Sequence, residues 1–519
     1  MDSAYKSSKE AFVSGTTGSS VSHINLVSSV AVLSIAFHTV LTLRIPKFES
    51  GPLFLLSFLT LVIPLLLVIT VFAHSPATFA LYVAVPTFLI SLIPCRENGT
   101  PLPSSSSADA PSARRQASLA PLPALTTYRA HMLLLTSLSI LAVDFPVFPR
   151  MLAKCETYGV SLMDMGVGSF VFSQGLTSAH PILRDPAYLS SPLAPKLIRT
   201  VKKCLPVLGM GIVRVLLVKG TEYPEHVTEY GVHWNFFLTL GILPILQLFL
   251  HPMLSRATTS ITVLGLLTAL SHHFGLSLGL ASYILHAPRT GFVSANKEGL
   301  ISLTGYLALH LLGLGTGTLV LPPSPTFFRR QQKQLKKRDS DSNLKSKSSP
   351  VQHRENDKTA TELVSYASIY WALLGICSLL GLGGGVSRRM VNLPYILWVA
   401  AYNTTFLLAY LILDLIFFPS PLSKSIYDPT SGLKVHARAG AGLEGRDGHT
   451  QDLAHAPDLL EAINRNGLLF FLLANLATGA VNLSMKTMYA SDQTSMSVLA
   501  IYSFGICWVA WALRYRRLF

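Results

Sequence analysis

A carboxylate and a lysine stand on either side of a proline-containing turn. Asp144 lies in Ala-Val-Asp-Phe-Pro-Val-Phe-Pro, residues 142–149, at the end of an apolar run, and Lys154 follows the second proline. Because proline cannot continue a helix, Asp144 is predicted to face a turn. If the connection folds back, Lys154 meets Asp144 and keeps the carboxylate ionised in a poorly hydrated pocket. Such a carboxylate can take a proton from a substrate hydroxyl. The alternative is a salt bridge that fixes the helical hairpin and has no catalytic role.

A second polar cluster precedes another apolar run, in Thr-Glu-Tyr-Gly-Val-His-Trp-Asn-Phe-Phe at residues 228–237. His233 is a candidate base, or a donor to a carbonyl oxygen, because the ordinary pKa of histidine lies close to neutrality. Trp234 and Asn235 are candidate substrate-binding residues beside it. The alternative is an aromatic belt at the membrane interface with a hydrated histidine next to it.

Other polar residues lie within or beside apolar runs. Arg214 is well inside a predicted span, where it can meet an anionic phosphate or a carboxylate of a neighbouring helix. Asp164 is also at membrane depth. Tyr158, Asn296 and Lys297 complete the candidate substrate-binding set.

The sequence does not indicate a metal or a bound cofactor. Its 5 cysteines are scattered, without a Cys-x-x-Cys pair or the spacing of metal ligands. His272 and His273 are adjacent on a predicted helix and point to different faces, so they make a poor metal pair. Neither a phosphate-binding loop nor a dinucleotide-binding fingerprint is present.

These candidates must be positioned by helices in a membrane. The chain has 519 residues, 50% of them hydrophobic and 13% charged, with a mean hydropathy of +0.45, whereas soluble domains carry about 25% charged residues. A backbone in lipid satisfies its own amides most simply as a helix. We therefore expect a single all-α polytopic membrane domain, residues 1–519, with about 13 transmembrane helices. The apolar runs are 26–43, 53–73, 79–93, 132–148, 160–176, 205–218, 236–250, 261–285, 300–321, 363–382, 393–418, 468–483 and 498–513.

The basic residues indicate orientation. The net charge is +15, but the lysines and arginines cluster in loops between apolar runs, which argues against nucleic-acid binding and for the positive-inside rule. Most of them fall on the side that includes the C-terminus, so we expect a cytosolic C-terminus and a lumenal N-terminus. Three cytosolic loops are predicted to be flexible from their polar composition, at residues 101–122, 328–358 and 424–456.

Several segments together resemble one known family. The segments at 142–149 and 228–237, with Glu-Thr-Tyr-Gly-Val-Ser-Leu-Met-Asp at 156–164, closely resemble the GPI-anchored wall transfer protein family, known in animals as PIG-W. Lys-Glu-Ala-Phe-Val-Ser at 9–14 and Ala-Asn-Lys-Glu-Gly at 295–299 look like the same family.

The resemblance implies an acyltransferase of the endoplasmic reticulum membrane. It would transfer a fatty acyl chain, typically palmitoyl, from acyl-CoA to the inositol 2-hydroxyl of glucosaminyl-phosphatidylinositol. Acyl-CoA is then a co-substrate, membrane lipids are the surroundings, and no further cofactor is required. Asp144 and Lys154 match the acid and the lysine assigned to catalysis in this family, and His233 and Asn235 match a family signature. A lipid transporter or flippase, and a non-catalytic scaffold of the GPI pathway, are the alternatives.

Overall fold

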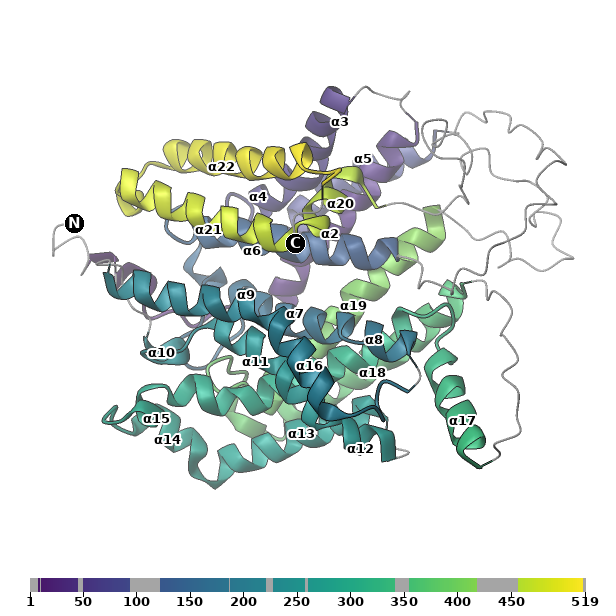
Figure 1. The fold of residues 1–519 in the computed structure, drawn as a ribbon. Coiled ribbons are helices and arrows are strands. Elements are labelled where there is room, and N and C mark those ends of the chain that lie inside the picture. Colours follow the sequence, from purple (N-terminus) through teal and green to yellow (C-terminus); the bar gives the residue numbers. More distant parts are fainter. Residues whose placement is uncertain are drawn as a thin grey trace, which may run out of the picture.

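The computed structural model describes residues 8–9, 11–44, 50–93, 122–185, 187–220, 227–256, 260–340, 354–417 and 456–516. Helices make up nearly all of the regular structure in these ranges (Figure 1), and the β pairing found there is one isolated bridge between Ser19 and Val160. The predicted all-α fold class is confirmed.

The helices follow one another with short connections or with segments outside the described residues. In chain order they are α2 (Val21–Thr42), α3 (Ser50–Ser57), α4 (Ile63–Ile69), α5 (Pro76–Ser91), α6 (Pro123–Ala142), α7 (Leu162–Thr177), α8 (His180–Arg184), α9 (Leu193–Gly220), α10 (Val227–Tyr230), α11 (Phe236–Phe249), α12 (His251–Arg256), α13 (Ile261–Gly275), α14 (Ala281–His286), α15 (Phe292–Ala295), α16 (Lys297–Val320), α17 (Phe327–Ser340), α18 (Asn356–Leu379), α19 (Leu393–Phe417), α20 (Asp458–Arg465), α21 (Gly467–Ser484) and α22 (Asp492–Ala512).

Many of these helices are suited to a membrane. Within the described ranges, 8 helical stretches are long and apolar enough to span one, and α5 and α11 are shorter apolar helices. The chain is therefore a polytopic membrane protein. The expected number of about 13 spans remains a prediction. The 8 stretches are 21–42, 51–69, 261–286, 297–320, 356–379, 393–417, 467–484 and 492–512.

One of the three predicted loops needs correction. Helix α17 occupies residues 327–340 and α18 begins at Asn356, so helices fill both ends of the range 328–358. The sequence reading relied on the missing apolar periodicity, but Gln, Lys, Arg and Leu are good helix formers, and Phe327 and Phe328 pack against the core at the start of α17. Residues 101–121 and 424–455 of the other two loops lie outside the described residues.

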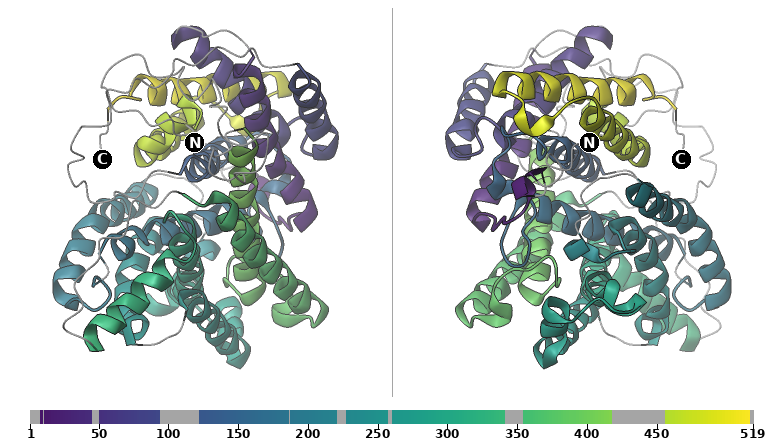
Figure 2. Two further views of the ribbon diagram at one scale, coloured as in Figure 1. Left: turned by 90° about the vertical axis from the view of Figure 1, so that its right-hand side faces the viewer. Right: turned by 90° about the vertical axis from the view of Figure 1, so that its left-hand side faces the viewer.

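Helices α6 and α7 run through the middle of the bundle. Helices α21 and α22 lie on one side of them and α13 to α15 on the opposite side (Figures 1 and 2). Helix α16 packs tightly on α7, because a Cβ at Gly175, Gly313 or Gly317 would collide with a carbonyl oxygen of the facing helix. Such small residues let membrane helices approach closely. This contact leaves another face of α7 to line a cavity shared with α6.

Candidate active site

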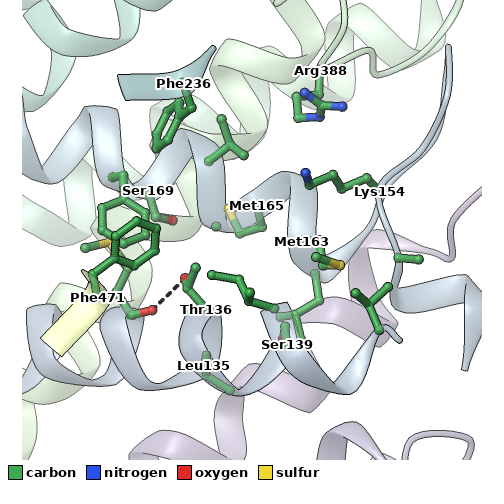
Figure 3. Close-up of a pocket in the computed structure, with 18 of the residues that line it drawn as sticks. Leu135, Thr136, Ser139, Lys154, Met163, Met165, Ser169, Phe236, Arg388 and Phe471 are labelled. Carbon is green, nitrogen blue, oxygen red and sulfur yellow. Dashed lines mark hydrogen bonds between the residues drawn. The ribbon is translucent and has the colours of Figure 1, made fainter. Parts of the chain in front are cut away.

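A cavity of about 410 Å³ lies between α6 and α7, with further walls from α2, α9, α19 and α21. Side chains at positions three or four apart on α6 face it, from Tyr128 through Leu135 to Ser139, because such positions share one face of a helix. Figure 3 shows Lys154 and Arg388 on one side of the cavity and Phe471 on the other. The cavity thus joins a charged end to an apolar interior.

The first charged group at this end is centred on Asp144. The ammonium of Lys9 lies 3.2 Å from Asp144 Oδ1, and Asn482 Nδ2 donates to Asp144 Oδ2 at 2.8 Å. Lys9 Nζ also donates to Asn482 Oδ1 at 2.8 Å, which closes a three-membered network. The side chains of Lys9 and Asp144 are 5% and 4% exposed. Asp144 is therefore a buried carboxylate with a fixed orientation.

The second charged group surrounds Lys154. Lys154 Nζ lies 3.0 Å from Glu229 Oε2, and Arg388 Nη2 is 4.0 Å from the other oxygen of Glu229. Arg388 Nε donates to Asp164 Oδ1 at 2.5 Å, and the backbone N–H of Cys155 donates to Asp164 Oδ2 at 2.9 Å. Two cations and two carboxylates thus alternate along this side of the cavity.

The predicted pair of Asp144 with Lys154 is wrong. The structure gives Asp144 the ammonium of Lys9 and gives Lys154 the carboxylate of Glu229. Both predicted residues nevertheless line the same cavity. The prediction paired Asp144 with a lysine close to it along the chain. In the structure a lysine far from it in sequence, Lys9, forms the ion pair.

The N-terminal segment brings Lys9 to the site. It lies against the loop that carries Lys154: Ser19 N donates to Val160 O at 2.7 Å, and Gly15 N donates to Glu156 Oε1 at 2.8 Å. The Thr16 hydroxyl donates to the carbonyl of Lys154. The same contacts therefore hold Lys9 and Lys154 on neighbouring parts of the cavity wall.

Asn235 lines the cavity, but its side chain is hydrogen-bonded to the backbone of two helices. Its Oδ1 caps α11 by accepting from Phe237 N and Leu238 N at 3.0 and 3.2 Å, and its Nδ2 donates to Gly211 O of α9 at 2.8 Å. Asparagine is a favoured cap because its carbonyl satisfies free amides of the first turn. Trp234 Nε1 donates to Thr239 Oγ1 at 2.9 Å and is not among the lining residues.

His233, Asn296 and Lys297 are grouped together away from this cavity. The backbone N–H of His233 donates to Asn296 Oδ1 at 2.7 Å, and the His233 ring stacks on Phe292. Lys297 Nζ donates to the carbonyl of Ala287 at 2.6 Å. None of the three lines the cavity. Their side chains fix the connections between helices, so the geometry gives them no contact with a molecule bound there.

The last two sequence candidates differ in their relation to the cavity. Arg214 on α9 lines it and is exposed. Tyr158 is 38% exposed and lies beside Gly384, outside the lining residues. Of the nine residues predicted to form the site, the cavity contains Asp144, Lys154, Asn235 and Arg214.

Cys155 also lines the cavity, next to Lys154. Burial raises the pKa of its thiol to about 12, and the nearby Asp164 carboxylate acts in the same direction. The thiol therefore remains protonated at neutral pH and is a poor nucleophile. The arrangement favours proton transfer through a carboxylate over a covalent intermediate on sulfur.

Neither Lys9 nor Asn482 is among the residues that the sequence predicts for the site, although Lys9 lies in the segment 9–14 that resembles the family. They stand 473 positions apart, and a pattern based on local spacing does not report so distant a contact. The one sequence signal for this contact is the position of Lys9 at the start of the segment 9–14.

Comparison with known proteins gives a consistent result. The GWT1 family model matches residues 5–513. A GPI-anchored wall transfer protein 1 of Gibberella zeae is 38% identical over 98% of this chain and 97% of its own length. Proteins of the same name from Aspergillus oryzae and Candida albicans are 38% and 32% identical, each over 99% of this chain and 98% of their own length.

Proposed function

This chain belongs to the GWT1 family, and on that premise we propose that it is the acyl-CoA-dependent O-acyltransferase of GPI-anchor biosynthesis. The reaction proposed is transfer of a fatty acyl chain, typically palmitoyl, to the inositol 2-hydroxyl of glucosaminyl-phosphatidylinositol. The printed names of the relatives support a role in the GPI pathway. The observation that carries the proposal is the single cavity that joins a buried carboxylate to an apolar interior.

Asp144 is the proposed general base. An inositol hydroxyl is a weak nucleophile that must lose its proton as it attacks the thioester carbonyl. Asp144 accepts that proton, a C–O bond to the acyl carbon forms, the C–S bond breaks, and the CoA sulfur leaves and takes up a proton. Lys9 and Asn482 hold the carboxylate in place. A positioned base of this kind contributes about 10²- to 10⁴-fold to the rate.

Lys154 is the proposed donor to the thioester oxygen, on which negative charge develops. Its ammonium faces the cavity (Figure 3) and is paired with Glu229, whose other oxygen lies 4.0 Å from Arg388. A donor that an ion pair already orients stabilises an oxyanion without further rearrangement. Lys154 therefore acts beside Asp144 instead of serving as its counter-ion.

Arg214 is the proposed contact for the phosphate of the lipid substrate. It lines the cavity from α9, and no ion pair or hydrogen bond of its side chain is found within the described residues. Arginine binds phosphate oxygens through charge-assisted hydrogen bonds, and a phosphodiester that enters between helices would supply such oxygens. The inositol ring would then lie between Arg214 and the charged end of the cavity.

The acyl chain is proposed to occupy the apolar interior, which includes Met132, Leu135, Ile140 and Met163. Each methylene that moves from water into such surroundings contributes about 0.8 kcal/mol. The protein is proposed to work in the endoplasmic reticulum membrane, with the N-terminus in the lumen and the C-terminus in the cytosol, as its basic loops indicate.

The test uses purified protein with labelled palmitoyl-CoA and glucosaminyl-phosphatidylinositol. We expect free CoA and a lipid product whose added acyl group mass spectrometry locates on the inositol 2-hydroxyl. A lipid transporter or a scaffold would leave palmitoyl-CoA intact, and that result would overturn the proposal.

A further inference from the structure

On α6, the cavity-lining residues farthest along the helix from Asp144 are Tyr128 and His131, and both are hydrogen-bonded to α19. Tyr128 donates to Asn403 Oδ1 at 2.6 Å, and the ring of His131 is hydrogen-bonded through Nδ1 to the hydroxyl of Tyr410 at 2.7 Å. All four residues line the cavity and are buried. Each pair links α6 to α19, so this end is closed by hydrogen-bonded side chains from both helices.

Helix α19 crosses α6 at this point. Asp414, further along α19, accepts from the backbone N–H of Ala124 at 2.9 Å, so a third contact joins the same two segments. Figure 1 shows α6 and α19 running in clearly different directions. A helix held across the cavity by three polar contacts forms a fixed boundary, because moving it would leave buried polar groups without partners.

We propose that this boundary, formed by the Tyr128–Asn403 and His131–Tyr410 pairs, sets the length of the acyl chain that the enzyme transfers. The inference rests on the proposed function and identifies residues that determine its specificity. Phe406, between Asn403 and Tyr410 on α19, and Ala31 of α2 also line the cavity. Phe406 packs on Tyr402 with ring centroids 4.4 Å apart.

The dimensions agree with a long-chain fatty acyl group. His131 lies eleven positions before Ala142, the last residue of α6, which corresponds to roughly 16 Å of helix. With carbon–carbon bonds of about 1.5 Å and angles near 111°, each bond of an extended chain advances roughly 1.25 Å. The length of α6 from the boundary to its last residue therefore corresponds to about 13 bonds, or an acyl chain of about 14 carbons, before the turn that carries Asp144.

Two substitutions move the boundary in opposite directions. Ala31→Leu fills part of the far end and should favour shorter chains, whereas Phe406→Ala opens space there and should favour longer ones. Tyr410→Ala removes one member of the His131–Tyr410 pair and opens space at the boundary, so it should also favour longer chains. Ala36→Leu is the matched control for an enlarged side chain, because Ala36 is buried on α2 but does not line the cavity.

The measurement is the ratio of kcat/KM values for myristoyl-, palmitoyl- and stearoyl-CoA within each variant. A ratio within one preparation is independent of the fraction of folded protein. When two methylenes of the acyl chain are no longer buried, or become buried, the ratio of kcat/KM values should change by about tenfold. We expect Ala31→Leu to raise the myristoyl-to-palmitoyl ratio and Phe406→Ala to raise the stearoyl-to-palmitoyl ratio, with the Ala36→Leu control unchanged.

Unchanged ratios in Ala31→Leu and Phe406→Ala, with active wild-type protein, would overturn the boundary and leave the proposed acyltransferase function intact. A shift in Ala36→Leu as large as that in Ala31→Leu would also overturn it, because the effect would then come from α2 and not from the cavity. Wild-type protein that transfers no acyl chain would refute the proposed function itself.

Discussion

Substitution of Asp144 and Lys9, singly and together, distinguishes a catalytic role of Asp144 from a purely structural one. Their side chains form an ion pair at 3.2 Å and are 4% and 5% exposed. Asp144→Asn removes the carboxylate that pairs with the buried ammonium of Lys9. Lys9→Met removes the ammonium that pairs with the buried carboxylate of Asp144. Removal of one member of a buried pair destabilises a protein by about 3 to 5 kcal/mol. Both single variants should therefore melt well below the wild type.

The double variant Lys9→Met/Asp144→Asn has no unpaired charge at this position. We expect it to regain about 2 to 3 kcal/mol relative to the sum of the single variants, as residues in direct contact do. Its turnover should nevertheless stay about 10² to 10⁴ times below that of the wild type, because the base is absent. Stability and activity should thus separate in one protein.

Thermal unfolding in detergent and the rate of CoA release with glucosaminyl-phosphatidylinositol give the two readouts. Glu298→Gln is the control: it breaks a buried pair with Arg289 outside the cavity, so it should lower stability while folded protein keeps its turnover. If the double variant regains substantial turnover together with its stability, the pair has only a structural role and Asp144 is not the base.

Three further predictions concern single residues and topology. Cys155→Ser should retain most of the turnover, because burial keeps the thiol protonated; a loss as large as that of Asp144→Asn would indicate a covalent acyl-enzyme. Arg214→Ala should raise KM for the lipid about tenfold or more and leave KM for acyl-CoA nearly unchanged, since an ion pair with phosphate is lost; equal effects on both substrates would contradict the phosphate contact. A tag at the C-terminus should be digested by protease added to sealed microsomes, and protection of the tag would contradict the positive-inside orientation.

The sequence predicted the kind of protein and part of the site. Apolar runs of sufficient length indicate membrane helices, because the bilayer imposes helical structure on them, and Asp144 and Lys154 were found because ionisable groups next to such runs are unusual. Their pairing could not be predicted. Lys154 is close to Asp144 along the chain, but the loop that carries it is held by Thr16 and Asp164 in a position that directs its ammonium to Glu229.

The motif at 228–237 shows a different limit. Its residues were chosen because histidine, tryptophan and asparagine are chemically versatile, but the same properties make them good structural residues. Asn235 caps α11, and His233 contacts Asn296 and Phe292. Residue type alone does not distinguish a polar side chain that faces a cavity from one that joins two helices, since the difference lies in tertiary packing.

The buried network around Asp144 is built from segments that lie far apart along the chain. Asp144 precedes α7 in the middle of the bundle, Lys9 comes from the N-terminal segment, and Asn482 lies near the end of α21. A buried carboxylate is stable only once its partners are in place, so the site is complete only after α21 has packed against α6. Asp144, the proposed base, therefore has both of its partners only when the first and the last parts of the chain lie against the turn after α6.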